Sequence, residues 1–156
     1  MDPGGVMAYH WRMHIDAPPE RVFDTLADVE HHPEWANPSA KLKMSSVSGG
    51  PPRIGSTYRS EQVFVGKPQT AEIKIVEFDR PNRFAFAVTQ RKQGSTKDVR
   101  YRHTFVLTPE GRGTRLERTT ASVGGNALLD AVVTPAVKAD GKKSLANLKR
   151  KLEAPA

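Results

Sequence analysis

The feature that most constrains this chain is a run of six strand-like segments between residues 40 and 123, with no helical pattern among them. Apolar and polar side chains alternate along most of these segments, which is typical of strands with one buried face and one wet face. Turn sequences separate the segments about every ten residues. Six such strands in a row predict an antiparallel meander. The turns are SGGPPRIG, GKP, DRPN and PEGRGT.

A further strand and one or two short helices precede this meander. Alternation of Tyr9, Trp11, Met13 and Ile15 with polar residues predicts a strand with one buried face. The sequence APPERVFDTLAD predicts a helix from about Pro18 to Ala27, because proline is tolerated in a first helical turn. VEHHPEWANP then predicts a second, short helix or turn.

The C-terminal part of the chain predicts one long helix, from about Asn126 to Glu153. Asn126 is a plausible N-cap, Gly141 weakens the helix, and the leucines after it recur at helical spacing. An antiparallel sheet with one apolar face needs a cover, and this helix is the obvious candidate. We therefore expect an α+β fold in which a curved seven-stranded antiparallel sheet surrounds the helix. One helix cannot fill the space inside such a sheet. The leucines of the stripe are Leu145, Leu148 and Leu152.

Length and composition point to one domain in a reducing compartment. The 156 residues suit a single domain over residues 6–153, with a flexible lead at 1–5 and a tail at 154–156. The absence of cysteine excludes disulfides, thiolate metal sites and cysteine nucleophiles, and it fits a cytoplasmic location. No stretch approaches the ~20 apolar residues of a membrane span, and the N-terminus lacks the apolar run of a signal peptide.

The net charge of +7 raises nucleic acid and anionic membranes as possible partners. The positive residues are scattered, however, and their densest group suits the solvated face of a terminal helix. We expect no nucleic-acid partner, no membrane insertion, and a monomer or a homodimer. The denser group is Lys142, Lys143, Lys149, Arg150 and Lys151.

The histidines are the first candidates for chemistry, because catalysis usually needs a positioned acid or base. His10 and His14 share the face of the first strand that we expect to be wet. His31 and His32 are neighbours in the predicted loop, and adjacent residues rarely ligate one metal well. We therefore expect no metal and no cofactor. His103 differs, because it shares a strand face with aromatic residues; it is either a ligand-orienting group or a histidine with a satisfied hydrogen bond.

Strand parity adds further polar groups to the expected inner face. Tyr58, Gln62 and Phe64 are in phase on their strand. Arg118 is in phase with Leu116, and an inward Arg118 would need a carboxylate or an anionic ligand group. An outward Arg118 is the simpler alternative, and a one-residue bulge would reverse any of these assignments. The candidate catalytic residues are His103, Tyr58 and Arg118.

Four segments of the sequence resemble the START-like superfamily, also called SRPBCC or birch-pollen-allergen-like, and within it the bacterial polyketide cyclase/dehydrase branch. The resemblance covers about residues 9–153 and implies a helix-grip fold around a hydrophobic cavity. It also implies that Trp35, which follows the first helices, lies at the cavity rim; the alternative is that Trp35 plugs the core. The segments are IDAPPERVFDTLADVEHHPEWANP, IGSTYRS, IVEFDRPNRFAF and LTPEGRGTRLERT.

Three functions are compatible with these observations. The first is binding or carrying a hydrophobic small molecule, lipid- or polyketide-like, in an internal cavity, and it is favoured because no catalytic constellation is evident. The second is a polyketide cyclase/aromatase or dehydrase, and the third is a protein-interaction domain like the chaperone regulators of the superfamily. Folds of this kind host several activities, so the function has to be inferred from the residues of the site. The expected ligand-contacting residues are Trp11, Trp35, Tyr58, Gln62, Phe64, Phe86, Tyr101, His103 and Phe105.

Overall fold

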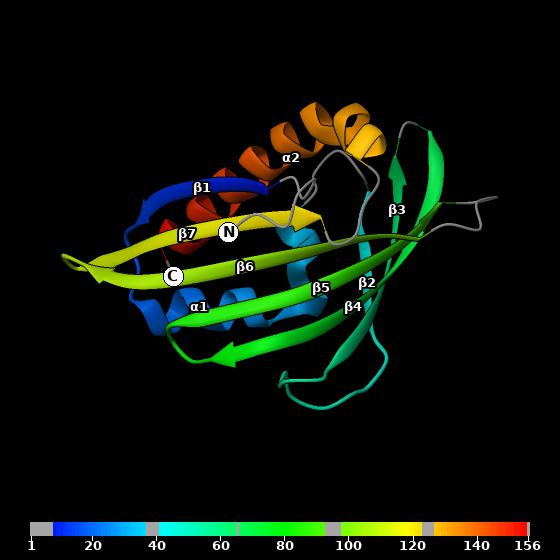
Figure 1. The fold of residues 1–156 in the computed structure, drawn as a ribbon. Helices are drawn as coiled ribbons and strands as arrows, with labels where there is room; N and C mark the ends of the chain where they lie inside the picture. The colour runs from blue at the N-terminus through cyan, green and yellow to red at the C-terminus, as the bar shows by residue number, and fades with distance from the viewer. Residues whose placement is uncertain (1–7, 37–40, 65, 93–97, 123–126, 156) are drawn as a thin grey trace.

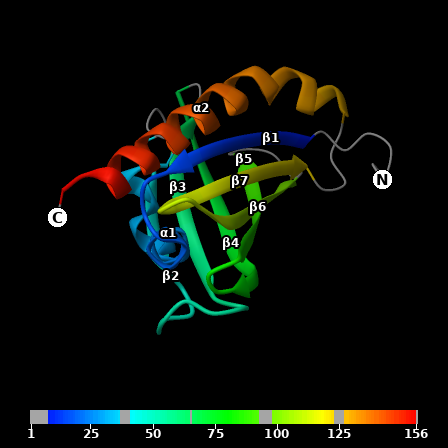
Figure 2. The same ribbon diagram turned by 90° about the vertical axis from the view of Figure 1, so that its left-hand side faces the viewer.

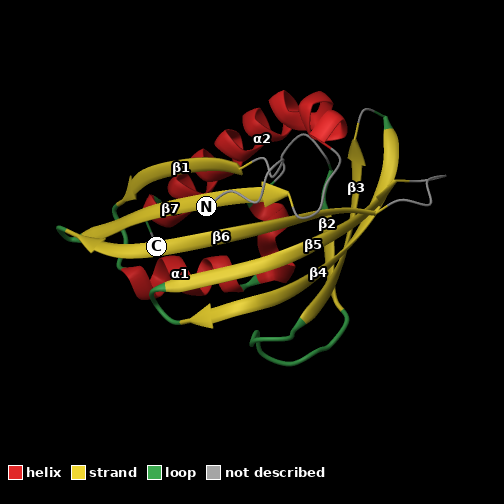
Figure 3. Cartoon of the chain, in the orientation of Figure 1, coloured by secondary structure: helices red, strands yellow, loops and turns green. Residues whose placement is uncertain are grey.

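Over the residues that it describes, a computed structural model shows a single antiparallel sheet of seven strands with three helices (Figures 1 and 3). The structure describes residues 8–36, 41–64, 66–92, 98–122 and 127–155. The backbone alone is described for Ala8, Phe64, Lys92, Asp98, Val99 and residues 127–137. The predicted lead at 1–5 and the N-cap at Asn126 lie outside the described residues.

The strands follow the predicted meander. Their order in the sheet is β1-β7-β6-β5-β4-β3-β2, so each strand of the meander pairs with its neighbour in sequence, and β1 closes on β7. A register shift between Ile75 and Glu77 bends β4, whereas β6 and β7 pair without interruption. Side-chain parity is therefore kept on the strands that matter most for the site. The strands are β1 (Ala8–Ile15), β2 (Lys43–Ser46), β3 (Thr57–Phe64), β4 (Lys67–Asp79), β5 (Arg83–Lys92), β6 (Asp98–Glu110) and β7 (Gly113–Ser122).

The helices occupy the concave side of the sheet. The helix α1 (Pro19–Ala27) contacts β5, β6 and β7, and the 3-10 helix η1 (Val29–Glu34) contacts β2. The long helix α2 (Ala127–Glu153) runs alongside β1, as Figures 1 and 2 show from two sides. Leu145, Leu148 and Leu152 are at most 3% exposed, which confirms the predicted apolar stripe. The predicted α+β fold is thus observed.

Gly141 has a packing role beyond the predicted weakening of the helix. A Cβ atom at this position would lie 2.9 Å from Cζ2 of Trp11, closer than real contacts allow. Glycine therefore lets the backbone of α2 rest on the indole ring of Trp11. This close approach fixes one side of the tryptophan, whose other neighbours form the site described below.

Polar contacts tie the last turns of α2 to the end of β1. The Asp16 backbone N–H donates to Glu153 Oε2 over 2.8 Å, and Lys149 Nζ donates to the His14 carbonyl over 2.6 Å. Lys149 also pairs with Glu153, and Lys151 pairs with Glu34 of η1. Two members of the basic group near the C-terminus are therefore engaged in contacts within the molecule.

Candidate functional site

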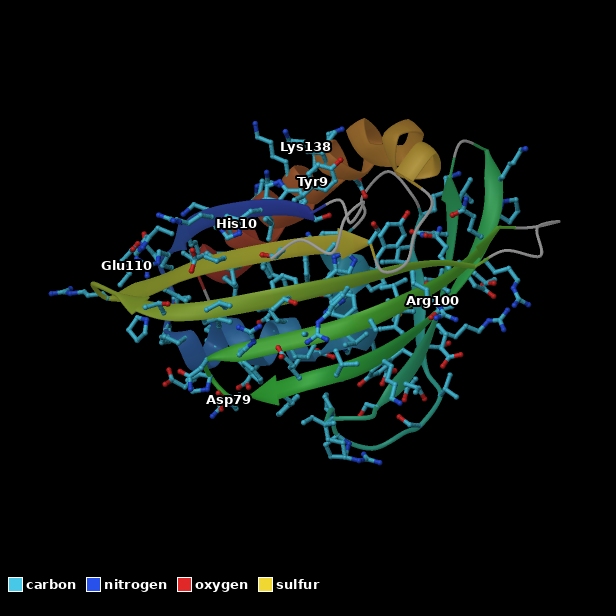
Figure 4. All side chains as sticks on the ribbon, in the orientation of Figure 1. Tyr9, His10, Asp79, Arg100, Glu110 and Lys138 are labelled. Atoms are coloured by element: carbon cyan, nitrogen blue, oxygen red, sulfur yellow. The ribbon has the colours of Figure 1, made fainter. Side chains whose placement is uncertain are left out.

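The inner face of the sheet carries the residues that strand parity predicted. Tyr58 on β3, Phe86 on β5 and Phe105 on β6 are each at most 8% exposed and point into the space covered by the helices. The outer face carries the polar partners; in Figure 4, Tyr9 lies toward α2 whereas His10 of the same strand lies away from it. The exposed His10 matches the prediction for the wet face. The side chain of Phe64 lies outside the described residues.

Arg118 lies on the inner face, so the simpler outward alternative is wrong. Arg118 is 8% exposed. It points inward because β7 pairs without a bulge, so Leu116 and Arg118 lie on the same face. The register places Trp11 of β1 and Phe105 of β6 directly opposite Arg118 on its two neighbouring strands. The guanidinium carbon lies 5.3 Å from the Trp11 ring centroid and 5.5 Å from that of Phe105. Both rings attract the cation and hold it in place.

His103 is the direct partner of Arg118. Its Nδ1 lies 3.1 Å from Arg118 Nη2 and 2.8 Å from Thr120 Oγ1. A guanidinium nitrogen can only donate, so Nδ1 accepts and the proton of the neutral ring sits on Nε2. Burial and the neighbouring cation of Arg118 both lower the pKa of His103 well below its ordinary value. His103 is therefore a neutral imidazole beside a buried cation at neutral pH.

His32 on η1 also points into the space between the sheet and the helices, which the sequence did not predict. It is 2% exposed, its Nε2 donates to the Leu26 carbonyl over 2.6 Å, and its ring centroid lies 5.6 Å from that of Phe86. Burial, with a smaller contribution from Arg118, lowers the pKa of His32 to about 4. The spacing of Val29 and His32, one helical turn apart, is the signal that could have placed both on the buried face of η1.

Trp35 lies in the core cluster rather than on the exposed edge of the inner face. It is 3% exposed, and its ring centroid lies 4.8 Å from that of His32. On its other side it lines an open surface groove of about 670 Å³, formed by α1, η1 and Lys151. This groove lies outside the space between sheet and α2, and most of the residues that line it have charged or polar side chains.

Tyr58 occupies a different part of the inner face. It lies on β3, three strands away from β6. Partial burial raises the pKa of the Tyr58 hydroxyl, and a hydrogen bond with Ser56 lowers it by less, so the net pKa is raised. Of the three candidate catalytic residues, the structure brings His103 and Arg118 together and leaves Tyr58 apart.

Burial changes along the strands of the inner face. At the end covered by α1, Ile15, Phe84 and Leu116 are at most 1% exposed. Farther along the sheet, the side chains on the inner face are only partly buried. The inner face is thus tightly packed at one end and half-open at the other. The half-open set is Trp11, Gln62, Val88, Gln90, Tyr101 and His103.

Neither a metal-binding cluster nor a membrane-spanning helix is found among the described residues. No group of three or more histidine, aspartate or glutamate side chains among them is arranged to hold a metal ion. No helix in the described part of the chain is both long enough and apolar enough to span a membrane. The half-open inner face, with buried Arg118 beside half-buried His103, is the site that the geometry offers.

The curved seven-stranded antiparallel sheet and the long C-terminal helix form the helix-grip fold of the START-like class of proteins. A sequence model of the family "Polyketide cyclase / dehydrase and lipid transport" matches residues 10–153. The chain belongs to this family, and the resemblance inferred from the four segments is confirmed.

Solved structures share the fold at low sequence identity. Protein CV1439 from Chromobacterium violaceum has a TM-score of 0.74 at 19% identity, covering 95% of this chain and 98% of that one. Ara h 8.0201 has a TM-score of 0.73 at 17% identity, covering 94% and 97%. Protein Ms6760 from Mycobacterium smegmatis has a TM-score of 0.70 at 17% identity, covering 96% and 92%. No curated protein matches the sequence.

Proposed function

We propose that the protein binds or carries a mostly apolar small molecule on the half-open part of the inner face, between the sheet and α2. The observation that carries this proposal is the change in burial along the strands, which leaves Trp11, Tyr101 and His103 accessible on a face that is otherwise core. Apolar walls give affinity without direction, and a few polar groups fix orientation. Family membership supports a hydrophobic ligand.

The polar groups that would orient the ligand come from several strands. His103 presents a neutral ring, Gln62 contributes an amide at the half-open end, and Tyr58 contributes a hydroxyl deeper in the sheet. At this end Val88 and Phe86 lie between these groups, and the inner face also carries the polar side chains of Gln69, Gln90 and Thr120. Such a mixed surface suits a lipid- or polyketide-like skeleton that carries some hydrogen-bonding groups.

One observation favours a polyketide cyclase or dehydrase as a second candidate. The neutral His103 could donate a hydrogen bond from Nε2 to a substrate oxygen while the cation of Arg118 stabilises developing negative charge. Tyr58 lies apart from this pair, so catalysis would rest on two side chains and on holding the chain in a folded shape. Binding of a small molecule without catalysis requires fewer assumptions than catalysis and is therefore our first proposal.

A protein-interaction role has weaker support. Among the described residues the large exposed hydrophobics are Val47, Ile54 and Val63, and the first two lie in the connection between β2 and β3. A contact surface of the superfamily's interaction domains would need a larger contiguous apolar patch. The lysines of α2 are partly engaged in the contacts with β1 and η1 described above.

Binding of a neutral, environment-sensitive dye tests the proposed function. N-phenyl-1-naphthylamine is expected to bind saturably with increased emission, and Tyr101→Ala is expected to weaken binding at least about fivefold, equivalent to ~1 kcal/mol. Tyr101 lies on the half-open inner face, whereas His10 lies on the outer face, so His10→Ala serves as the control with unchanged affinity. The proposal is wrong if the wild-type protein shows no saturable binding.

A further inference from the structure

Arg118 is a buried cation with donors left over. A guanidinium carries five N–H donors. Nη2 donates to His103, whereas Nε and Nη1 are shielded from water and have no hydrogen-bond partner. Within the described residues no carboxylate forms an ion pair with Arg118; Asp140 of α2 acts on it only through a weaker electrostatic attraction. Burial lowers the pKa of Arg118 to about 10, so the group stays charged at neutral pH.

A buried charge without a paired counter-charge is costly, so its retention needs a reason. The immediate partners of Arg118 are neutral or aromatic. His103 accepts a hydrogen bond through Nδ1, and Trp11 and Phe105 lie against the guanidinium carbon. His32, a further titratable group nearby, also has a lowered pKa, and Asp140 attracts the cation without forming an ion pair with it. The site therefore has one positive charge that its direct contacts do not neutralise.

The geometry of the guanidinium leaves one complete fork of donors for a ligand. Nη2 carries two N–H groups, and His103 occupies one of them. The second lies beside either the Nε donor or an Nη1 donor, and each such pair matches the two oxygens of a carboxylate. The rings of Trp11 and Phe105 hold the guanidinium, so the fork is ordered before a ligand arrives.

We propose that Arg118 binds the carboxylate of an apolar carboxylic acid whose hydrocarbon part lies on the half-open inner face. This inference rests on the proposed function, because it names the chemical class of the ligand for the same site. His103 positions the guanidinium through its Nδ1, and Thr120 Oγ1 fixes the imidazole over 2.8 Å. A carboxylate would supply the missing charge and satisfy donors that are otherwise orphaned.

A matched pair of probes tests the inference. Titrations use 12-(1-pyrenyl)dodecanoic acid and its methyl ester, which differ only in the charge of the head group. Wild-type protein is expected to bind the acid at least tenfold more tightly than the ester. Arg118→Met removes the fork but keeps an apolar chain of similar length, so it is expected to abolish the preference and bring the affinity for the acid to that for the ester.

Two further variants support the interpretation. Arg118→Lys keeps a charge without the planar fork and is expected to retain only part of the preference for the acid. Arg102→Met removes an outer-face arginine that pairs with Glu77, and is expected to keep the full preference. If Arg118→Met does not fold by circular dichroism, the wild-type ratio together with the ratio for Arg118→Lys decides the question.

The outcomes separate this inference from the proposed function. If neither probe binds to wild-type protein, the proposed function fails, and the carboxylate inference fails with it. If both probes bind equally tightly, the proposed function stands and the carboxylate inference is wrong. Dodecyl phosphate displacing the acid probe more strongly than dodecanoic acid would also contradict it, because the site would then favour a phosphate over a carboxylate.

Discussion

Replacing Leu148 by alanine is expected to lower the free energy of unfolding by about 2–5 kcal/mol, the range for removing a fully buried leucine from a packed core. Leu148 has no exposed surface and lies in the cluster that joins α2 to the sheet and to α1. The cost arises from lost apolar burial and from the cavity left behind. Urea unfolding followed by circular dichroism measures the change.

An exposed residue on the same helix provides the control for this prediction. Lys142→Ala alters an exposed side chain of α2 and is expected to change stability by no more than about 0.5 kcal/mol. A loss of stability in Leu148→Ala as small as that in Lys142→Ala would show that the C-terminal half of α2 does not pack on the sheet. The cover over the inner face would then be absent, and the site would lose its second wall.

Acidification is expected to destabilise the protein through His32, by about 3 kcal/mol between pH 6.5 and pH 4. The pKa of His32 is about 4 in the folded protein, against an ordinary histidine pKa of 6.5. The unfolded chain therefore takes up a proton before the folded chain does. The stabilisation by neutral His32 is complete above pH 6.5, falls as the pH drops, and levels off below pH 4. His103 acts in the same direction.

The variant His32→Gln isolates this effect. The glutamine amide nitrogen lies at about the position of the imidazole Nε2, so it can donate to the Leu26 carbonyl but does not titrate. The stability difference between wild type and variant is therefore expected to change by about 3 kcal/mol between pH 7 and pH 4. His31→Gln is the matched control. A hydrogen bond from exposed His31 to Asp28 raises its pKa, so its contribution is present below pH 6.5 and is lost as the pH rises. A wild-type pH profile that His32→Gln leaves unaltered would contradict the buried, neutral assignment.

The order of the strands and helices could be predicted from the sequence because local patterns determine each element. Period-two alternation on β6 and β7 put Tyr101, His103 and Leu116 on the correct face. The leucine stripe identified the buried side of α2. Each assignment needed only residues close in sequence.

The environment of the candidate site could not be predicted in the same way. Whether Arg118 faces inward depends on the absence of a bulge in β7, and its placement between Trp11 and Phe105 depends on the register of three strands. The contact between Gly141 and Trp11 joins a helix and a strand 130 residues apart in sequence. These are long-range properties, and single-segment patterns do not encode them.

His32 was missed for a different reason. The sequence of its segment predicts a loop or short helix with polar histidines, and a lone polar residue in such a segment is usually exposed. In the structure the 3-10 helix η1 turns His32 toward the core, where the Leu26 carbonyl satisfies its N–H. His31 next to it is exposed and pairs with Asp28. The two histidines differ only in which side of η1 they occupy.

The most direct test of ligand binding on the inner face uses the two tryptophans of the chain. Trp11 belongs to the half-open end, whereas Trp35 is buried in the core beside the surface groove. In a Trp35→Phe variant only Trp11 emits, and titration with methyl 9,10-dibromostearate, a neutral contact quencher, is expected to quench its emission saturably at one ligand per chain. In the reciprocal Trp11→Phe variant, Trp35 is expected to be quenched far less. Unquenched Trp11, or stronger quenching of Trp35, would contradict the account and place any ligand in the groove beside α1 instead.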